Sequence, residues 1–258
     1  MKVAVAGKGG VGKSTIAAAV ALLWARKGRR VLAVDADPDA NLAAAMGFPP
    51  DLQQRIVPIA EQRALIEERT GARVREYGQI FKLNPEVSDI AEKCAVSHQG
   101  VDLLVLGAIE AGGSGCACPE NVLIRTLLAD VVLHQDDVVV IDFEAGVEHL
   151  GRGTASGVDT MLVVVDPGPW ALQCAQNTHA MAQQIGLTDV RVVANKILSA
   201  DDEGFVRQSL SGLEIVGSIP YSTSIRDAER QGSSIVDLDT DLLGRFEAIV
   251  ERLAQTRE

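Results

Sequence analysis

Two short stretches of the chain combine residue types that could do chemistry. Residues 7–14 read GKGGVGKS, with a lysine and a hydroxyl directly after closely spaced glycines. Residues 112–121 read GGSGCACPEN, with Cys116 and Cys118 separated by one residue. The first pattern is typical of a phosphate-binding loop, and the second offers two soft sulfur ligands for a metal ion.

The first stretch has the spacing Gly7-x-x-x-x-Gly12-Lys13-Ser14. Glycines in such a loop let backbone N–H groups turn inward around a phosphate, and the start of the following helix adds partial positive charge. Lys13 would reach the β- and γ-phosphates, and Ser14 would ligate Mg²⁺. The alternative is a glycine-rich turn that binds nothing. We predict a nucleotide site to which this loop contributes Gly9, Gly10, Val11, Gly12, Lys13, Ser14 and Thr15.

Short apolar runs alternate with helical patterns along the chain and must position these loops. Predicted strands lie at 2–7, 30–35, 101–107, 137–142, 160–166, 190–195 and 214–219, and most are continuously apolar. Predicted helices lie at 13–27, 119–133, 170–185, 202–210, 222–231 and 239–256. This alternation indicates an α/β fold, a mostly parallel sheet of about seven strands with helices on both faces. We expect one P-loop NTPase domain over 1–258, with 51–98 as an irregular, partly helical excursion.

The composition limits where the protein works and what it binds. The 258 residues are 47% hydrophobic and carry a net charge of -11. Such a charge disfavours unspecific binding to nucleic acid or to an anionic membrane surface. The start lacks the apolar length of a signal peptide, and no run reaches the roughly 18 apolar residues of a membrane span. Four cysteines do not make a disulfide framework, so we expect a cytoplasmic protein with reduced thiols.

An additional lysine extends the phosphate-loop motif. With Lys8, the string GKGGVGKST resembles the deviant Walker A loop of the family that includes nitrogenase iron protein, MinD and ParA. The resemblance implies that Lys8 crosses a dimer interface to the partner's nucleotide, so that nucleotide binding and homodimerisation are coupled. It also implies catalytic roles for Lys8 and Lys13.

Carboxylates that would coordinate Mg²⁺ and orient the attacking water follow two predicted strands. Asp37 stands before a proline in DADPDANL, and the resemblance implies that it orients the attacking water as part of switch I. Asp39 and Asn41 are weaker candidates, since a solvated turn also suits them. Asp142 ends an apolar strand and matches the Walker B aspartate that holds Mg²⁺.

The segment after Asp142 matches the family's switch II. The resemblance implies that the N–H of Gly146 meets the γ-phosphate. Glu144 lies beside it, and Glu148 or His149 could relay the nucleotide state to the interface. His149 could equally be a surface loop residue.

The base is predicted from the segment NKIL at 195–198. A guanine-specific site would carry an aspartate at its fourth position, where this chain has Leu198. The family resemblance implies adenine contacts from Asn195 and from the backbone after a later strand. We therefore predict ATP or ADP as ligand, with Asn195, Lys196, Pro220 and Tyr221 binding the nucleotide. A turn-forming role for Asn195 is the alternative.

The Cys-x-Cys pair needs two further ligands to close a metal site. In an extended segment, Cys116 and Cys118 point to the same side, and Pro119 would start a helix capped by Cys118. Cys94 or Cys174 could complete the set, but the same pair from a second chain does so more economically. The alternative is two unrelated thiols. The residue types do not identify the metal.

A narrower resemblance covers nearly the whole chain. GGSGCACPEN and DFEAGVEHLGRGT, with ERTGA and FKLNPEVSDI in the excursion, resemble the family of carbon monoxide dehydrogenase maturation ATPases. The resemblance implies a cytoplasmic, dimeric, ATP-hydrolysing metallochaperone that binds one Ni²⁺ or Zn²⁺ per dimer and aids nickel insertion. Its client would be carbon monoxide dehydrogenase or, in a related system, acetyl-CoA synthase.

Two other functions fit parts of the sequence. A MinD- or ParA-like spatial-organising ATPase would use a membrane helix or a basic DNA patch. Here the C-terminal apolar stripe predicts a helix packed on its own sheet, and the net charge opposes DNA binding. An iron–sulfur carrier like nitrogenase iron protein would take its cysteines from two separate loops.

Overall fold

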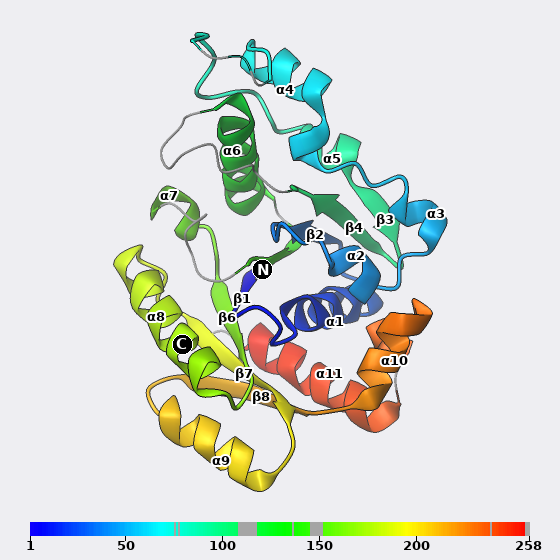
Figure 1. Ribbon diagram of the computed structural model, residues 1–258, viewed down its shortest axis with the longest axis vertical. Coiled ribbons are helices and arrows are strands. Elements are labelled where there is room, and N and C mark those ends of the chain that lie inside the picture. Colours follow the sequence, from blue (N-terminus) through cyan, green and yellow to red (C-terminus); the bar gives the residue numbers. More distant parts are fainter. Residues whose placement is uncertain are drawn as a thin grey trace.

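A twisted sheet organises the chain (Figure 1). The computed structural model describes residues 1–74, 76, 78–107, 118–135, 137–144, 152–237 and 239–255. In this part of the chain the sheet has eight strands in the order β3-β4-β2-β5-β1-β6-β7-β8. Their bounds are β1 (Lys2–Ala6), β2 (Val31–Asp35), β3 (Val96–His98), β4 (Val101–Val105), β5 (Val138–Asp142), β6 (Thr160–Val165), β7 (Val190–Ile197) and β8 (Glu214–Pro220).

The predicted parallel α/β sheet is confirmed, with one addition. Seven strands run parallel at the predicted positions, and β3 pairs antiparallel with β4 at the edge. β3 has three residues, too few to show a hydrophobic period. Strands β2, β5 and β6 are buried throughout, as expected of strands covered on both faces.

Helices cover both faces of the sheet. Helices α1 (Lys13–Arg26) and α11 (Thr240–Ala254) pack together on one side, and α6 (Pro119–His134) and α8 (Pro169–Gln184) lie on the other (Figure 1). α9 (Ala200–Ser209) packs on β7. The remaining helices are shorter: α2 (Leu42–Ala45), α3 (Pro50–Gln53), α4 (Arg63–Thr70), α5 (Ile90–Cys94), α7 (Arg152–Ala155), α10 (Thr223–Gln231), and the 3₁₀ turns η1 (Ile59–Glu61) and η2 (Ile235–Asp237).

The apolar stripe of the C-terminal helix is buried inside the molecule, as predicted. Leu242, Phe246 and Ile249 of α11 are each at most 3% exposed. A side chain at Gly217 of β8 would collide with Ile249, so helix and sheet are in close contact. No helix in the described ranges combines the length and apolar character needed to cross a membrane.

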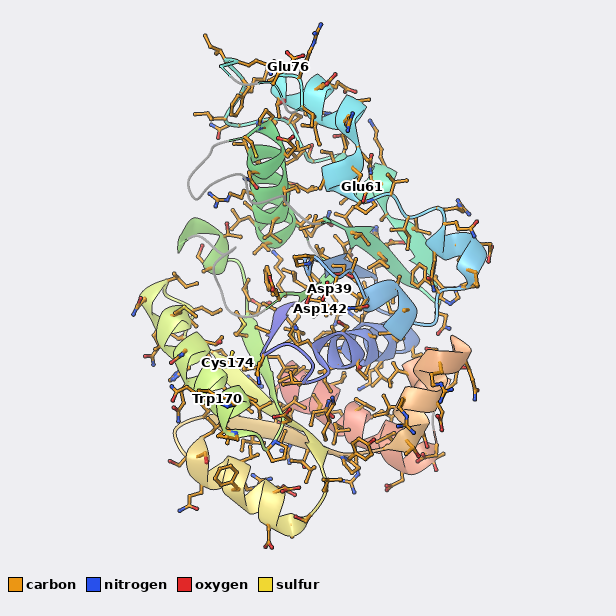
Figure 2. All side chains as sticks on the ribbon, in the orientation of Figure 1. Asp39, Glu61, Glu76, Asp142, Trp170 and Cys174 are labelled. Carbon is orange, nitrogen blue, oxygen red and sulfur yellow. The ribbon has the colours of Figure 1, made fainter. Side chains whose placement is uncertain are left out.

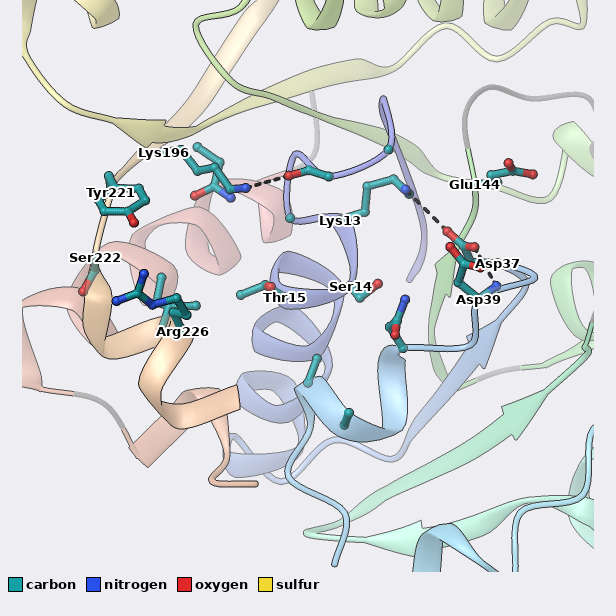
Figure 3. A pocket seen from close by; sticks show the side chains of 18 of the residues that line it. Lys13, Ser14, Thr15, Asp37, Asp39, Glu144, Lys196, Tyr221, Ser222 and Arg226 are labelled. Carbon is teal, nitrogen blue, oxygen red and sulfur yellow. Dashed lines mark hydrogen bonds and ion pairs between the residues drawn. The ribbon is translucent and has the colours of Figure 1, made fainter. Parts of the chain in front are cut away.

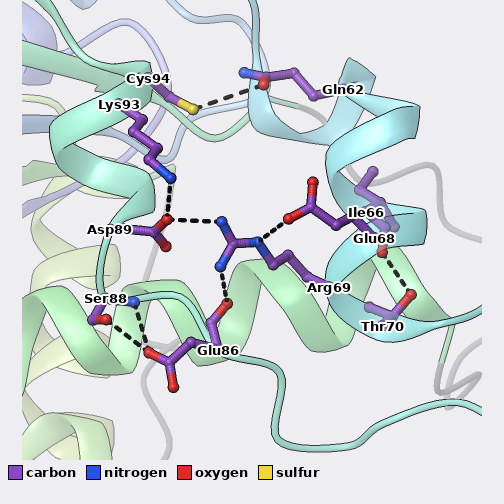
Figure 4. A network of polar contacts seen from close by, with 10 residues as sticks. All are labelled: Gln62, Ile66, Glu68, Arg69, Thr70, Glu86, Ser88, Asp89, Lys93 and Cys94. Carbon is purple, nitrogen blue, oxygen red and sulfur yellow. Dashed lines mark hydrogen bonds and ion pairs between the residues drawn. The ribbon is translucent and has the colours of Figure 1, made fainter.

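The segment 51–98 contains the short helices α3, α4 and α5, the turn η1 and the strand β3, and a polar network connects α4 with α5 (Figure 4). Arg69 of α4 donates to the carboxylate of Asp89 at 2.8 Å and to the carbonyl of Glu86 at 3.2 Å. Lys93 of α5 donates to the same Asp89 carboxylate at 2.6 Å. The hydrogen bonds hold the pKa of Asp89 well below its usual range, and α4 packs against α6.

Candidate functional site

A cleft of about 670 Å³ opens at the carboxyl ends of the parallel strands (Figure 3). Its walls come from the loops after β1, β2, β5, β7 and β8, the edge at which α/β sheets bind ligands. Nineteen residues line it: Gly9, Gly10, Gly12, Lys13, Ser14, Thr15, Asp37, Asp39, Asn41, Ala44, Ala45, Glu144, Asn195, Lys196, Pro220, Tyr221, Ser222, Ile225 and Arg226. Most of the residues predicted to bind nucleotide therefore share one cavity.

The backbone conformation of the phosphate loop requires glycine at two positions. Gly7 has φ 147°, and a Cβ there would collide with the carbonyl oxygen of Val164 on β6. Gly12 has φ 96°, and a Cβ there would collide with the side-chain amide of Asn195. Helix α1 begins directly afterwards, at Lys13, so its N-terminal N–H groups face the cleft as a phosphate site requires.

Lys13 and Asp37 form a buried ion pair in this cleft (Figure 3). The Nζ of Lys13 lies 3.4 Å from Oδ2 of Asp37, and both side chains are at least 90% buried. Asp35 supports the Asp37 loop, because its two carboxylate oxygens accept from the backbone N–H groups of Asp37 and Leu42 at 3.2 and 2.9 Å. Burial raises the pKa of Asp35 to about 6.

Asp142 ends β5 and is fully buried, so it does not itself line the cleft, but it lies next to Ser14, which does. Neither of its carboxylate oxygens makes a hydrogen bond of good geometry with the described residues. Burial raises its pKa to about 7, while the nearby Ser14 hydroxyl opposes the shift. An unsatisfied buried carboxylate beside a serine hydroxyl is a donor set that suits Mg²⁺.

The residues predicted to contact the nucleotide base line the same cleft, and two of them, Asn195 and Lys196, also bond to the phosphate loop. Asn195 Nδ2 donates to the carbonyl of Val11 at 2.8 Å, and Lys196 Nζ donates to that of Gly10 at 2.6 Å. Tyr221 donates its backbone N–H to Ile197 at 2.9 Å, which joins the ends of β7 and β8. Leu198 is exposed and offers no side-chain acceptor for guanine.

Several cleft residues were not predicted from the sequence. Ala44 and Ala45 of α2, and Ile225 and Arg226 of α10, line the cavity. Arg226 lies five residues after the predicted Tyr221, in α10, and this proximity was the available signal. Val11 is buried and Lys8 is exposed, and neither lines the cleft. The predicted switch II residues Gly146, Glu148 and His149 lie outside the described residues.

Of the two predicted metal ligands, the structure describes only Cys118. Cys118 caps α6 and Pro119 is its first residue, as predicted. Cys116 lies outside the described residues. Cys94 donates its thiol to Gln62 at 3.7 Å, and Cys174 lies on α8 (Figure 2). Within the described ranges, no three His, Cys, Asp or Glu residues gather as potential metal ligands.

Fold and cleft together define a P-loop nucleotide-binding protein, and the residues present fit a Mg²⁺–nucleotide complex. The family model described as the CobQ/CobB/MinD/ParA nucleotide binding domain matches residues 2–235, and the chain belongs to this family. Similar curated proteins include the carbon monoxide dehydrogenase accessory protein CooC of Rhodospirillum rubrum. It is 42% identical over 255 residues, which cover 99% of this chain and 97% of the relative.

Other similar proteins span the chain equally well. An uncharacterized ATP-binding protein of Methanocaldococcus jannaschii is 40% identical and covers 96% of each chain. Among solved structures, a ParA family ATPase of Chlorobium tepidum has a TM-score of 0.70 at 17% identity, covering 99% of this chain and 98% of that one. MinD of Pyrococcus furiosus has a TM-score of 0.68 at 20% identity, covering 98% of each. These likenesses confirm the fold.

Proposed function

We propose that this protein is a cytoplasmic ATPase that assists the maturation of carbon monoxide dehydrogenase by handling nickel. ATP binds the cleft with Mg²⁺ and is hydrolysed to ADP and phosphate. Cys116 and Cys118 from each of two protomers hold one Ni²⁺ or Zn²⁺ between them. Nucleotide binding brings the protomers together and hydrolysis releases them.

The 42% identity to an accessory protein of carbon monoxide dehydrogenase, over nearly the whole of both chains, carries the proposal. The position of Cys118 supports it further. A helix N-cap favours the thiolate form, and thiolates bind nickel and zinc in preference to magnesium. Two thiolates fall short of the four that a closed zinc site uses, which favours a contribution from a second copy.

The cleft residues divide the hydrolysis reaction between them. The N-terminus of α1 and Lys13 bind the phosphates, and Ser14 and Asp142 hold Mg²⁺, which polarises the terminal phosphate. Asp37 orients the attacking water once the phosphates have drawn Lys13 away from it. Asn195, Pro220 and Tyr221 surround the base. Lys8 is exposed and available to a partner's nucleotide.

A spatial-organising role is less well supported. MinD and ParA proteins share the fold at low identity, which carries no information on function. The apolar face of α11 is occupied by this chain's own core, so that helix presents no apolar stripe to a membrane.

The test is activation of nickel-deficient carbon monoxide dehydrogenase in an anaerobic mixture of purified protein, Ni²⁺ and Mg²⁺–ATP. We expect activation by the wild type and by Cys174→Ser, and its loss with Cys116→Ser or Cys118→Ser. ATPase activity should persist in all four proteins. Equal activation by all of them, or activation without ATP, would contradict the proposal.

A further inference from the structure

Two consecutive residues at the end of β7 both bind the phosphate loop. Asn195 donates to the carbonyl of Val11, and Lys196 donates to the carbonyl of Gly10 (Figure 3 shows the second bond). They therefore hold two successive carbonyl groups of the loop. The bond from Lys196, at 2.6 Å, is short and charge-assisted.

A regular strand could not make both contacts. Successive side chains of a strand point to opposite faces of the sheet, so Asn195 and Lys196 should diverge. Lys196 instead has φ 59°, in the left-handed region that a lysine rarely adopts. The pairing of β7 with β8 also shifts register between Ala194 and Ile197. Such an irregularity re-aims a side chain, here toward the loop.

The direction of the loop carbonyls matters for phosphate binding. A phosphate loop works when its N–H groups face the ligand, whereas an inward carbonyl would repel the phosphate oxygens. The hydrogen bond from Lys196 holds the Gly10 carbonyl toward β7. The ammonium of Lys196 thereby donates to the protein backbone. The left-handed backbone conformation of Lys196 is unfavourable, and strain of this kind is typically retained at functional sites.

The same irregular segment supports the other wall of the cleft. Ile197, the next residue, accepts the backbone N–H of Tyr221 at 2.9 Å. Both Lys196 and Tyr221 line the cavity. The end of β7 therefore sets the phosphate loop and the base-side wall relative to each other.

We propose that Lys196 is a positioning residue that forms the phosphate loop before nucleotide arrives, rather than a cation that binds the nucleotide. Without its hydrogen bond, only a fraction of molecules has a competent loop. The apparent affinity is then multiplied by that fraction for every nucleotide that uses the loop. The proposal rests on nucleotide binding by this site and is independent of the metal and the client.

Hydrogen exchange measured on the full chain without nucleotide tests the proposal. We compare the wild type with Lys196→Met, Lys196→Arg and Lys27→Met. Lys27 is a matched control, since its exposed ion pair with Glu251, at 3.9 Å, lies at the far end of α1. In Lys196→Met, backbone amides of residues 8–13 should exchange faster, and Lys196→Arg should restore protection. Lys27→Met should leave these amides unchanged.

Calorimetry and kinetics on the same variants separate the two roles. Lys196→Met should weaken ADP and ATP by the same factor, about tenfold for a loop competent in a tenth of molecules, with kcat at saturation unchanged. Unchanged exchange without nucleotide, or a larger loss for ATP than for ADP, would overturn the proposal. Should Lys196→Met fail to fold, Lys196→Asn tolerates the left-handed backbone and also lacks the ammonium, so the same results are expected.

Discussion

The ammonium of Lys13 lies 3.4 Å from the carboxylate of Asp37, although the two residues follow different strands. The lysine expected to bind phosphate is thus paired with the carboxylate expected to orient water. Both side chains are almost fully buried, so the pair is poorly screened. In the proposed reaction, nucleotide phosphates compete with Asp37 for Lys13, which would link nucleotide binding to release of the carboxylate proposed to orient water.

Replacing Asp37 should therefore separate binding from hydrolysis. In Asp37→Asn we expect ATP affinity to be unchanged or higher, because Lys13 loses its competitor. Hydrolysis should fall by at least about 100-fold, the usual contribution of a positioned base. Calorimetry and phosphate release measure the two quantities, with Asp39→Asn as the control. Loss of binding in Asp37→Asn, as large as in Lys13→Ala, would contradict this account.

Replacing Asp142 should remove the Mg²⁺ dependence of nucleotide binding. Its carboxylate is fully buried, and its oxygens make no good hydrogen bond with the described residues. Asp142→Asn should therefore leave the melting temperature of the nucleotide-free protein unchanged or higher. The extra stabilisation by ATP with Mg²⁺ over ATP with EDTA should disappear. Asp241→Asn, at an exposed ion pair on α11, should retain it. If Asp142→Asn keeps this extra stabilisation by Mg²⁺, the assignment of Asp142 as a Mg²⁺ ligand is wrong.

Arg191 anchors the C-terminal helix to the sheet. Its guanidinium is 3% exposed, pairs with Asp189 at 3.0 Å, and donates to the carbonyls of Arg252 and Gln255 at 2.6 and 3.1 Å. Arg191→Met should lower the free energy of unfolding by about 3 kcal/mol, because the carboxylate and the carbonyls lose their donor. Arg207→Met removes an exposed pair with Glu203 and should cost less than about 1 kcal/mol. Urea unfolding of both variants measures these changes. Equal losses of unfolding free energy in Arg191→Met and Arg207→Met would refute the anchoring role of Arg191.

The excursion should contribute a pH-dependent part of the stability. Arg69 and Lys93 hold the pKa of Asp89 below its usual range. A carboxylate with a depressed folded pKa contributes its full stabilisation above its unfolded pKa of about 4, and loses it progressively as pH falls from that value through the folded pKa. The urea midpoints of wild type and Asp89→Asn should differ by a constant amount from pH 7 to 5. This difference should begin to shrink as pH falls below 4. A difference that stays constant from pH 5 down to pH 2 would count against the network.

The sheet was predictable because its strands are buried on both faces, which leaves continuous apolar runs. β3 was not, because its three residues have no period, and its pairing with β4 depends on tertiary contact. The phosphate loop was predictable because its chemistry requires a fixed local spacing. By contrast, the bond from Lys196 to Gly10 spans 186 positions and depends on a register shift that no local pattern encodes.

The contributions of Arg226 and Ala44 to the cleft likewise come from how α10 and α2 fold back over it. The Cys-x-Cys pair is an intermediate case. Its helix-capping end was predicted from the order of Cys118 and Pro119. The completion of the site by a second chain remains a proposal.

The most direct test of the central claim is anaerobic metal analysis combined with measurement of molecular mass, with no nucleotide, with ADP and with ATP. We predict one Ni²⁺ or Zn²⁺ per dimer, with the dimer strengthened by ATP, and loss of that metal in Cys116→Ala and Cys118→Ala while ATP binding persists. Metal retained at full stoichiometry by either variant, or one metal bound per monomer, would contradict a site shared by two protomers.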